Sequence, residues 1–188
     1  MTFEVKKIYM EKKYFKEEQR FSNFWLYIFV TIAFTIAISP TAVALYSQLV
    51  MGVPYGDEPT SDQALMVLLC VLLIMYMLTL LLFNKMKLVI EITGEGLLFR
   101  YPPFILKYKV VLKEEIEKYK IRKYNPIREY SGWGIRYSWA KAGRAYNVKG
   151  NIGLQLYLID GKKILFGTQR GDAMLRAMDK MMKENERE

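Results

Sequence analysis

Residues 65–83 read Leu-Met-Val-Leu-Leu-Cys-Val-Leu-Leu-Ile-Met-Tyr-Met-Leu-Thr-Leu-Leu-Leu-Phe, and this stretch decides the fold class. It contains no charged residue, no Gly and no Pro. About 20 such residues in a helix match the hydrocarbon core of a bilayer. The run also lacks the polar stripe that a helix packed onto a soluble core would carry. It therefore predicts a transmembrane helix over about residues 64–84.

A second uncharged stretch, residues 21–56, comes before this run. It is too long for one bilayer crossing at the helical rise per residue, so we expect a first span at about 24–46, with Pro40 as a candidate kink. The alternative is a signal peptide, with Ala42-Val43-Ala44 as its cleavage site. The segment before the stretch argues against cleavage, because it is longer than a signal n-region and contains the acids Glu4, Glu11, Glu17 and Glu18.

The charges beside the two spans predict their orientation. Bases precede the first span and follow the second, at Lys6, Lys7, Lys12, Lys13, Lys16, Arg20, Lys85 and Lys87. The loop at 50–63 has three acids and no base. By the positive-inside rule, a hairpin over 23–84 crosses the inner membrane, with residues 1–22 and 85–188 both in the cytoplasm and the loop outside.

The composition agrees with a membrane protein that carries a separate domain. The chain of 188 residues has a formal charge of +9, yet 52% of it is hydrophobic, which does not suit one soluble globule. It has a single cysteine, Cys70, and no histidine. This excludes an intrachain disulfide, His-based zinc sites and His-dependent nucleophiles. We predict a protein that is not an enzyme and holds no cofactor or metal.

Beyond Lys87 the apolar residues alternate with polar ones, which is typical of half-buried strands. Gly94-Glu95-Gly96 and Asp160-Gly161 are hairpin signals. Strands are expected at 88–92, 97–101, 104–110, 116–124, 133–137, 145–149, 153–159 and 163–166. A methionine stripe including Met174, Met178 and Met181 predicts a C-terminal amphipathic helix. Residues 85–188 are thus expected to form a small β-barrel or sandwich of about seven strands, capped by this helix.

Three motifs in this region carry a resemblance to a known family. They are Gly132-Trp133-Gly134-Ile135-Arg136, Ala145-Tyr146-Asn147-Val148-Lys149-Gly150, and the run from Gly153-Leu154-Gln155-Leu156 to Phe166-Gly167-Thr168-Gln169. With two preceding spans, this order resembles the bacterial pleckstrin-homology-like (PH-like) membrane proteins over roughly residues 85–183. The resemblance implies a fold and brings no catalytic residues, so a function transferred from it is an analogy.

A basic strand face is the first candidate site. Its members are Lys107, Lys109, Lys118, Lys120 and Arg122, which period-two alternation places on strand surfaces. They could hold an anionic lipid headgroup at the cytoplasmic leaflet. The competing interpretation is a solvated sheet face that keeps the domain soluble.

The stretch 126–143 is the second candidate. It combines aromatic and basic residues of the kind enriched at binding hot spots: Arg128, Tyr130, Trp133, Arg136, Tyr137 and Trp139. They could dock a protein partner or lie in the membrane interface. The competing interpretation is that Trp133, together with Tyr146, fills the barrel.

Together these features predict a protein that presents a PH-like domain at the membrane for protein contacts or scaffolding, including self-association. Recognition of anionic lipid headgroups by the basic strand face is the alternative. Besides the lipid bilayer we expect a protein partner. No nucleic-acid-binding signature and no small-molecule substrate site is recognisable in the sequence.

Overall fold

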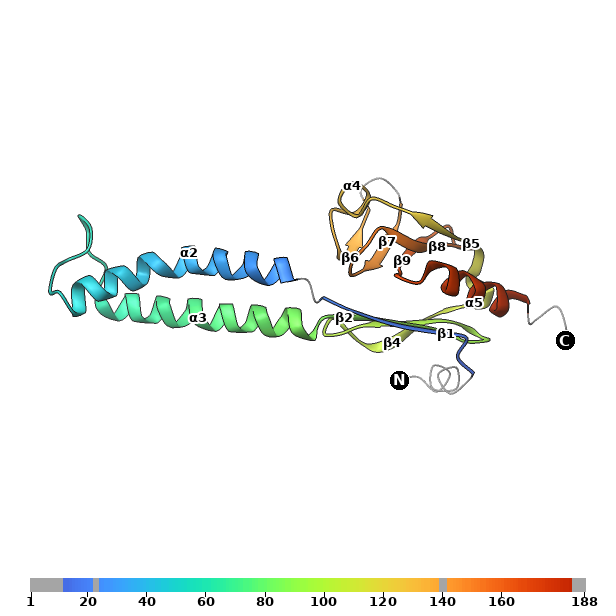
Figure 1. Ribbon diagram of the computed structural model, residues 1–188, viewed down its shortest axis with the longest axis horizontal. Coiled ribbons are helices and arrows are strands. Elements are labelled where there is room, and N and C mark those ends of the chain that lie inside the picture. The colour runs from blue at the N-terminus through green and yellow to red at the C-terminus, as the bar shows by residue number, and fades with distance from the viewer. Residues whose placement is uncertain (1–11, 22–23, 139–141, 184–188) are drawn as a thin grey trace. The chain divides into compact units, whose positions relative to one another are not determined.

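The computed structural model describes residues 12–21, 24–138 and 142–183 (Figure 1). The chain divides into two compact units. One contains residues 22–85, and the other combines residues 1–21 with residues 86–188.

The smaller unit is a pair of apolar helices, α2 (Phe24–Leu49) and α3 (Asp62–Lys85). Both are long and apolar enough to cross a membrane, so the prediction of two long apolar helices is confirmed. Helix α2 ends three residues later than expected, and Pro40 lies inside it. Most of the large apolar side chains on both helices are exposed, so their surface needs an apolar environment.

Contacts at both ends of the pair join the two helices. Near one end, the Thr31 and Tyr76 hydroxyls lie 3.1 Å apart. Near the other, Gln48 Nε2 donates to Asp62 Oδ1 at 2.8 Å. Between them, a small apolar cluster buries Ala44, Leu45 and Leu65. The two helices therefore pack as an antiparallel hairpin.

The larger unit contains two open sheets. The first has the order β1-β2-β3-β4, all antiparallel. Its strands are β1 (Phe15–Arg20), β2 (Lys87–Ile92), β3 (Gly96–Tyr101) and β4 (Ile105–Leu112). The 3-10 turn η1 (Lys113–Glu115) leads from this sheet to the second.

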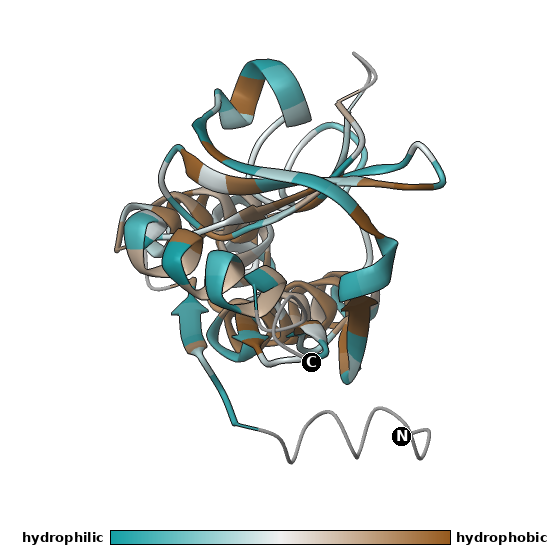
Figure 2. Ribbon diagram, turned by 90° about the vertical axis from the view of Figure 1, so that its right-hand side faces the viewer, coloured by the Kyte–Doolittle hydropathy of each residue, from teal (hydrophilic) through white to brown (hydrophobic). Residues whose placement is uncertain are grey.

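The second sheet has the order β5-β8-β9-β7-β6, in which only β7 and β9 are parallel. Its strands are β5 (Ile116–Lys123), β6 (Gly134–Tyr137), β7 (Arg144–Asn147), β8 (Ile152–Leu158) and β9 (Lys163–Gly167). The short helix α4 (Pro126–Tyr130) lies between β5 and β6, and α5 (Gly171–Lys183) closes the unit. Figure 2 shows how hydrophobic and hydrophilic residues alternate along these elements.

The core joins the two sheets and α5. The Phe99 ring of the first sheet lies 4.6 Å from that of Tyr146 and 4.9 Å from that of Phe166, both in the second sheet. Helix α5 packs on β5 and β8 and also on β1 and β2. Its residues Met174, Met178 and Met181 are fully buried, so the predicted methionine stripe is core packing. The structure thus confirms the prediction of a β-rich domain that ends in a helix.

The predicted domain boundaries left strand β1 outside the β domain, but the structure places it inside. Residues 1–22 were expected to be a separate segment before the first span, but residues 15–20 pair along the whole of β2. Glu17 and Gln19 occupy two of the three buried positions of β1, so the strand lacks an apolar alternation. That is why the sequence did not indicate it. The β domain is therefore built from chain on both sides of the helical hairpin.

Hydrogen bonds pair Glu17 through both carboxylate oxygens and Gln19 through its amide nitrogen, whereas the buried Gln19 Oε1 has no partner among the described residues. Glu17 accepts from Thr168 Oγ1 at 2.5 Å and from the Gln169 amide at 2.8 Å. Gln19 Nε2 donates to the Gly167 carbonyl at 2.7 Å. A buried polar group costs little when it is paired in this way. Edge strand β1 is thereby attached to the segment that leads from β9 into α5.

Replacing Glu17 tests this attachment. Glu17→Ala leaves a buried hydroxyl and a backbone amide without their acceptor, so it should destabilise the β domain by about 1–3 kcal/mol. Glu18 is the matched control, because it lies next to Glu17 on the outer face and forms only partly exposed ion pairs with Arg20 and Lys87. Glu18→Ala should cost less than about 1 kcal/mol. The stability of both variants is measured by denaturation in the same lipid or detergent. An equal loss of stability in the two variants would contradict the attachment of β1 through Glu17.

Candidate functional site

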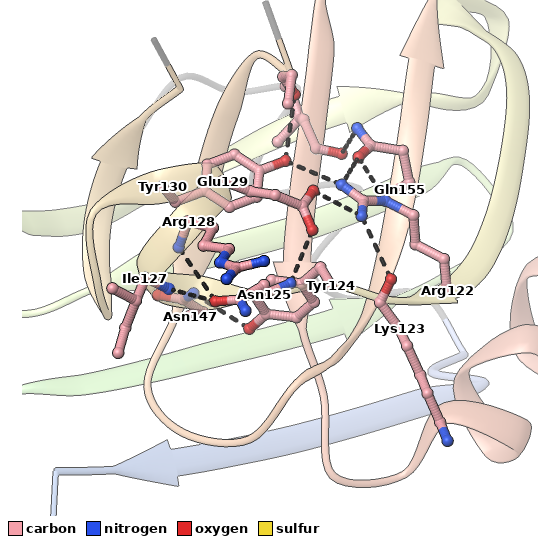
Figure 3. A network of polar contacts seen from close by, with 12 residues as sticks. Arg122, Lys123, Tyr124, Asn125, Ile127, Arg128, Glu129, Tyr130, Asn147 and Gln155 are labelled. Atoms are coloured by element: carbon pink, nitrogen blue, oxygen red, sulfur yellow. Dashed lines mark hydrogen bonds and ion pairs between the residues drawn. The ribbon is translucent and has the colours of Figure 1, made fainter. Parts of the chain in front are cut away.

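The polar network around Arg122 positions the second candidate stretch (Figure 3). Arg122 Nη1 forms an ion pair with Glu129 Oε2 at 2.8 Å, and its other guanidinium nitrogens donate to Gln155 Oε1 at 3.1 and 3.2 Å. Nη2 also donates to the Tyr130 hydroxyl at 3.3 Å. A charged, multiply bonded guanidinium is a strong local constraint. Arg122 therefore connects strands β5 and β8 to helix α4.

Helix α4 forms because its first residues satisfy their own backbone. The Asn125 side chain accepts from the amides of Ile127 and Arg128, and Glu129 Oε1 accepts from the Asn125 amide at 2.7 Å. Pro126 suits the first helical position, where no amide donor is needed. A helix over 126–130 was not predicted, because Glu129 follows the cap residue Asn125 by four positions, whereas the usual capping-box pattern places the acid at the third.

A second network orients the chain after α4. Ser131, the C-cap residue that follows the helix, has the left-handed conformation (φ 58°), and Gly134 (φ 114°) begins β6. The fully buried Asn147 accepts from the Gly134 amide at 2.8 Å and donates to the Tyr124 hydroxyl at 3.1 Å. Trp133 Nε1 donates to the Gly150 carbonyl at 3.2 Å. The turn from α4 into β6 is thus held by side-chain and backbone bonds.

The six predicted docking residues have different environments. Tyr130 is fully buried although it was predicted as a docking residue, and burial raises the pKa of its hydroxyl, which donates to the Ala142 carbonyl. Of the two residues that the core interpretation named, Tyr146 is buried and Trp133 is exposed. Trp139 lies outside the described residues. The other four side chains are exposed: Arg128, Trp133, Arg136 and Tyr137. Together with the exposed Ile127, we call these four the α4–β6 surface.

Two contacts hold members of the α4–β6 surface in place. Arg136 Nε donates to the Trp133 carbonyl at 2.9 Å. Arg144 donates to the Tyr137 hydroxyl, and its guanidinium carbon lies 4.5 Å from the centre of the Tyr137 ring. Preorganised aromatic and arginine side chains favour binding, because less conformational entropy is lost when a partner docks. In addition, β6 is one of the two edge strands of its sheet.

The basic strand face is split between the two sheets. Lys107 and Lys109 lie on edge strand β4 of the first sheet, whereas Lys118, Lys120 and Arg122 lie on edge strand β5 of the second. Arg122 is occupied by the network described above. Lysines on edge strands also discourage edge-to-edge pairing with other chains. This gives Lys107, Lys109, Lys118 and Lys120 a structural explanation that needs no ligand.

A basic groove between β1 and α5 was not predicted. Its volume is about 440 Å³, and the bases that line it are Lys12, Lys13, Lys16, Arg170, Arg176 and Lys180. Several of these have structural partners. Lys180 Nζ lies 4.6 Å from the centre of the Tyr14 ring, and the Arg170 guanidinium lies 5.4 Å from that of Phe15. The groove is therefore not a set of unpartnered cations.

Lys13 and Lys16 contact a buried carboxylate. Glu91 on β2 is fully buried and lies 2.7 Å from Lys13 Nζ and 3.4 Å from Lys16 Nζ. It also accepts from the Tyr108 hydroxyl at 3.1 Å. Burial by itself would raise the pKa of Glu91, but the bonds and charges of Lys13, Tyr108 and Lys16 outweigh it and lower the pKa. Glu91 is therefore ionised at neutral pH and neutralises part of the basic groove.

Among the described residues, no group of three or more His, Cys, Asp or Glu side chains is placed to hold a metal ion. Comparison with family models, curated proteins and solved structures finds no match to this chain. The resemblance to the PH-like membrane proteins therefore remains a prediction.

Replacing Arg122 separates its structural role from a ligand-binding one. Arg122→Ala leaves Gln155, Tyr130 and Glu129 without a shared donor, so it should destabilise the β domain by about 2 kcal/mol. Lys120→Ala is the matched control, because Lys120 is an exposed base on the same strand whose Nζ lies 5.8 Å from the Tyr157 ring centre. We expect a change within about 0.5 kcal/mol for this variant. Equal loss of stability, measured by thermal denaturation, would contradict the structural role of Arg122.

Proposed function

We propose that this chain is a two-span inner-membrane protein without enzymatic activity. In this proposal α2 and α3 cross the membrane, both termini are cytoplasmic, and the β domain is a PH-like module that binds a protein partner, including a second copy of the chain. The exposed apolar surface of α2 and α3 supports the spans. Two sheets followed by a C-terminal helix are compatible with the PH-like interpretation.

The observation that carries the docking proposal is the α4–β6 surface. It presents one aliphatic, two aromatic and two arginine side chains from a single stretch, residues 127–137, and the Arg122 and Asn147 networks hold that stretch. Exposed aromatic and arginine residues on a rigid scaffold are typical of protein-binding hot spots. The neighbouring edge strand β6 adds backbone groups that a partner strand could pair with.

The split of the basic strand face weighs against the lipid alternative. A headgroup site requires bases that converge on one anion, and these five residues are divided between strands of different sheets. We therefore favour a protein as the ligand of the β domain.

Position-specific photocrosslinking in native membranes tests this function. A photoreactive residue at Tyr137, which is 62% exposed, should form a protein adduct that disappears when Arg136 is changed to Glu. The same residue at Ile159, which is 68% exposed at the turn between β8 and β9, is the matched control and should form none. An adduct of twice the chain mass would identify self-association. Equal adducts at both positions, or lipid adducts alone at Tyr137, would contradict docking at this surface.

A further inference from the structure

Two large apolar side chains are exposed at residues 102–106, which join β3 to β4 and include the first two residues of β4; we call this segment the β3–β4 turn. Phe104 is 59% exposed and Leu106 is 69% exposed. The hairpin that carries them, residues 96–112, contains no acid and has three bases: Arg100, Lys107 and Lys109. Apolar side chains flanked by bases are the combination that binds at the surface of an anionic bilayer.

This turn lies at the end of the first sheet from which the chain continues into both apolar helices. Helix α3 ends at Lys85 and β2 begins at Lys87, whose amide donates to the Pro102 carbonyl at 3.2 Å. On the other side of β2, Arg20 pairs with Lys87, and α2 begins at Phe24. Two residues of chain span at most about 7 Å, so the Pro102 carbonyl lies within about 10 Å of the last residue of α3.

That distance is comparable with the thickness of the bilayer interface. The headgroup region of one leaflet is about 5–8 Å thick. If α3 spans the bilayer, Lys85 lies at or near this region, since a lysine at a helix end extends its ammonium toward the headgroups. A turn that begins within about 10 Å of Lys85 can therefore reach the interface without any rearrangement of the sheet.

We propose that the β3–β4 turn inserts Phe104 and Leu106 into the interface of the bilayer that α2 and α3 cross. This proposal rests on the proposed membrane insertion of these helices. At the same end of the sheet lie Lys107 and the ion-paired group of Arg20, Lys87 and Glu18, and Lys85 ends α3 next to them. The net charge of these side chains is positive, which suits anionic headgroups. The β domain thereby gains a third attachment to the membrane besides its two covalent connections, and its rotation about them is restricted.

An exposed apolar residue needs no explanation by itself, and Ile159 provides the comparison. Ile159 is 68% exposed and Leu106 is 69% exposed. The surroundings of Ile159 differ, because Asp160 follows it and its amide donates to the carbonyl of Glu115, beyond the far end of β4. Ile159 thus matches Leu106 in exposure but lies beyond the opposite end of β4.

Spin-label accessibility in the full-length protein tests the proposal. In a Cys70→Ala background, single cysteines replace Phe104, Leu106, Ile159 or Ile74, and each is labelled with a nitroxide. The protein is reconstituted into vesicles of phosphatidylcholine and phosphatidylglycerol. Power saturation then compares collisions with oxygen, which concentrates in lipid, with collisions with a water-soluble nickel chelate. Ile74 is an exposed position on α3 and reports on the span itself.

We expect a severalfold higher ratio of oxygen to nickel collisions at 104 and 106 than at 159, shifted toward the value at 74. A lipid-like value at 74 combined with equal, water-like values at 104, 106 and 159 would overturn the insertion of the turn while leaving the spans intact. A water-like value at 74 would overturn both the spans and the proposal that rests on them.

Discussion

The pairing of β1 with β2 is the constraint on which the β domain depends. These strands lie on opposite sides of the helical hairpin in the sequence, and they pair in register from Phe15 with Ile92 to Arg20 with Lys87. The pairing extends to a bond from the Phe21 amide to the Met86 carbonyl. The chain therefore enters α2 and leaves α3 from neighbouring positions on one sheet. A domain built in this way cannot form fully until both helices have been synthesised.

The same strand connects the first sheet to the C-terminal part of the chain. Glu17 and Gln19 bind the segment that leads into α5, and α5 packs against strands of both sheets. On the second sheet, the Arg122 and Asn147 networks hold the α4–β6 surface in a similar way. Buried polar groups with satisfied bonds specify one arrangement, because each alternative would leave them unpaired. The candidate docking surface is thus supported by polar networks as much as by apolar packing.

The sequence predicted the elements with strong periodicity and missed those that depend on polar contacts. The uncharged runs predicted α2 and α3, alternation and Gly-containing turns predicted the strands after Lys87, and the methionine stripe predicted α5. Strand β1 was missed because its buried positions include Glu17 and Gln19, whose partners lie about 150 residues away. Tyr130 and Arg122 were interpreted as surface residues. Their hydrogen bonds, from Arg122 to Gln155 and from Tyr130 to Ala142, form only in the folded domain and leave no pattern in the sequence.

Hydrogen exchange of the full-length protein in lipid nanodiscs measures the β1–β2 pairing most directly. We expect the β1 amides that face β2 to exchange as slowly as those of β2 and β3, while the outward amides of this edge strand exchange faster. It would be contradicted if every amide of residues 15–20 exchanged at the rate of an unstructured chain while β2 and β3 remained protected.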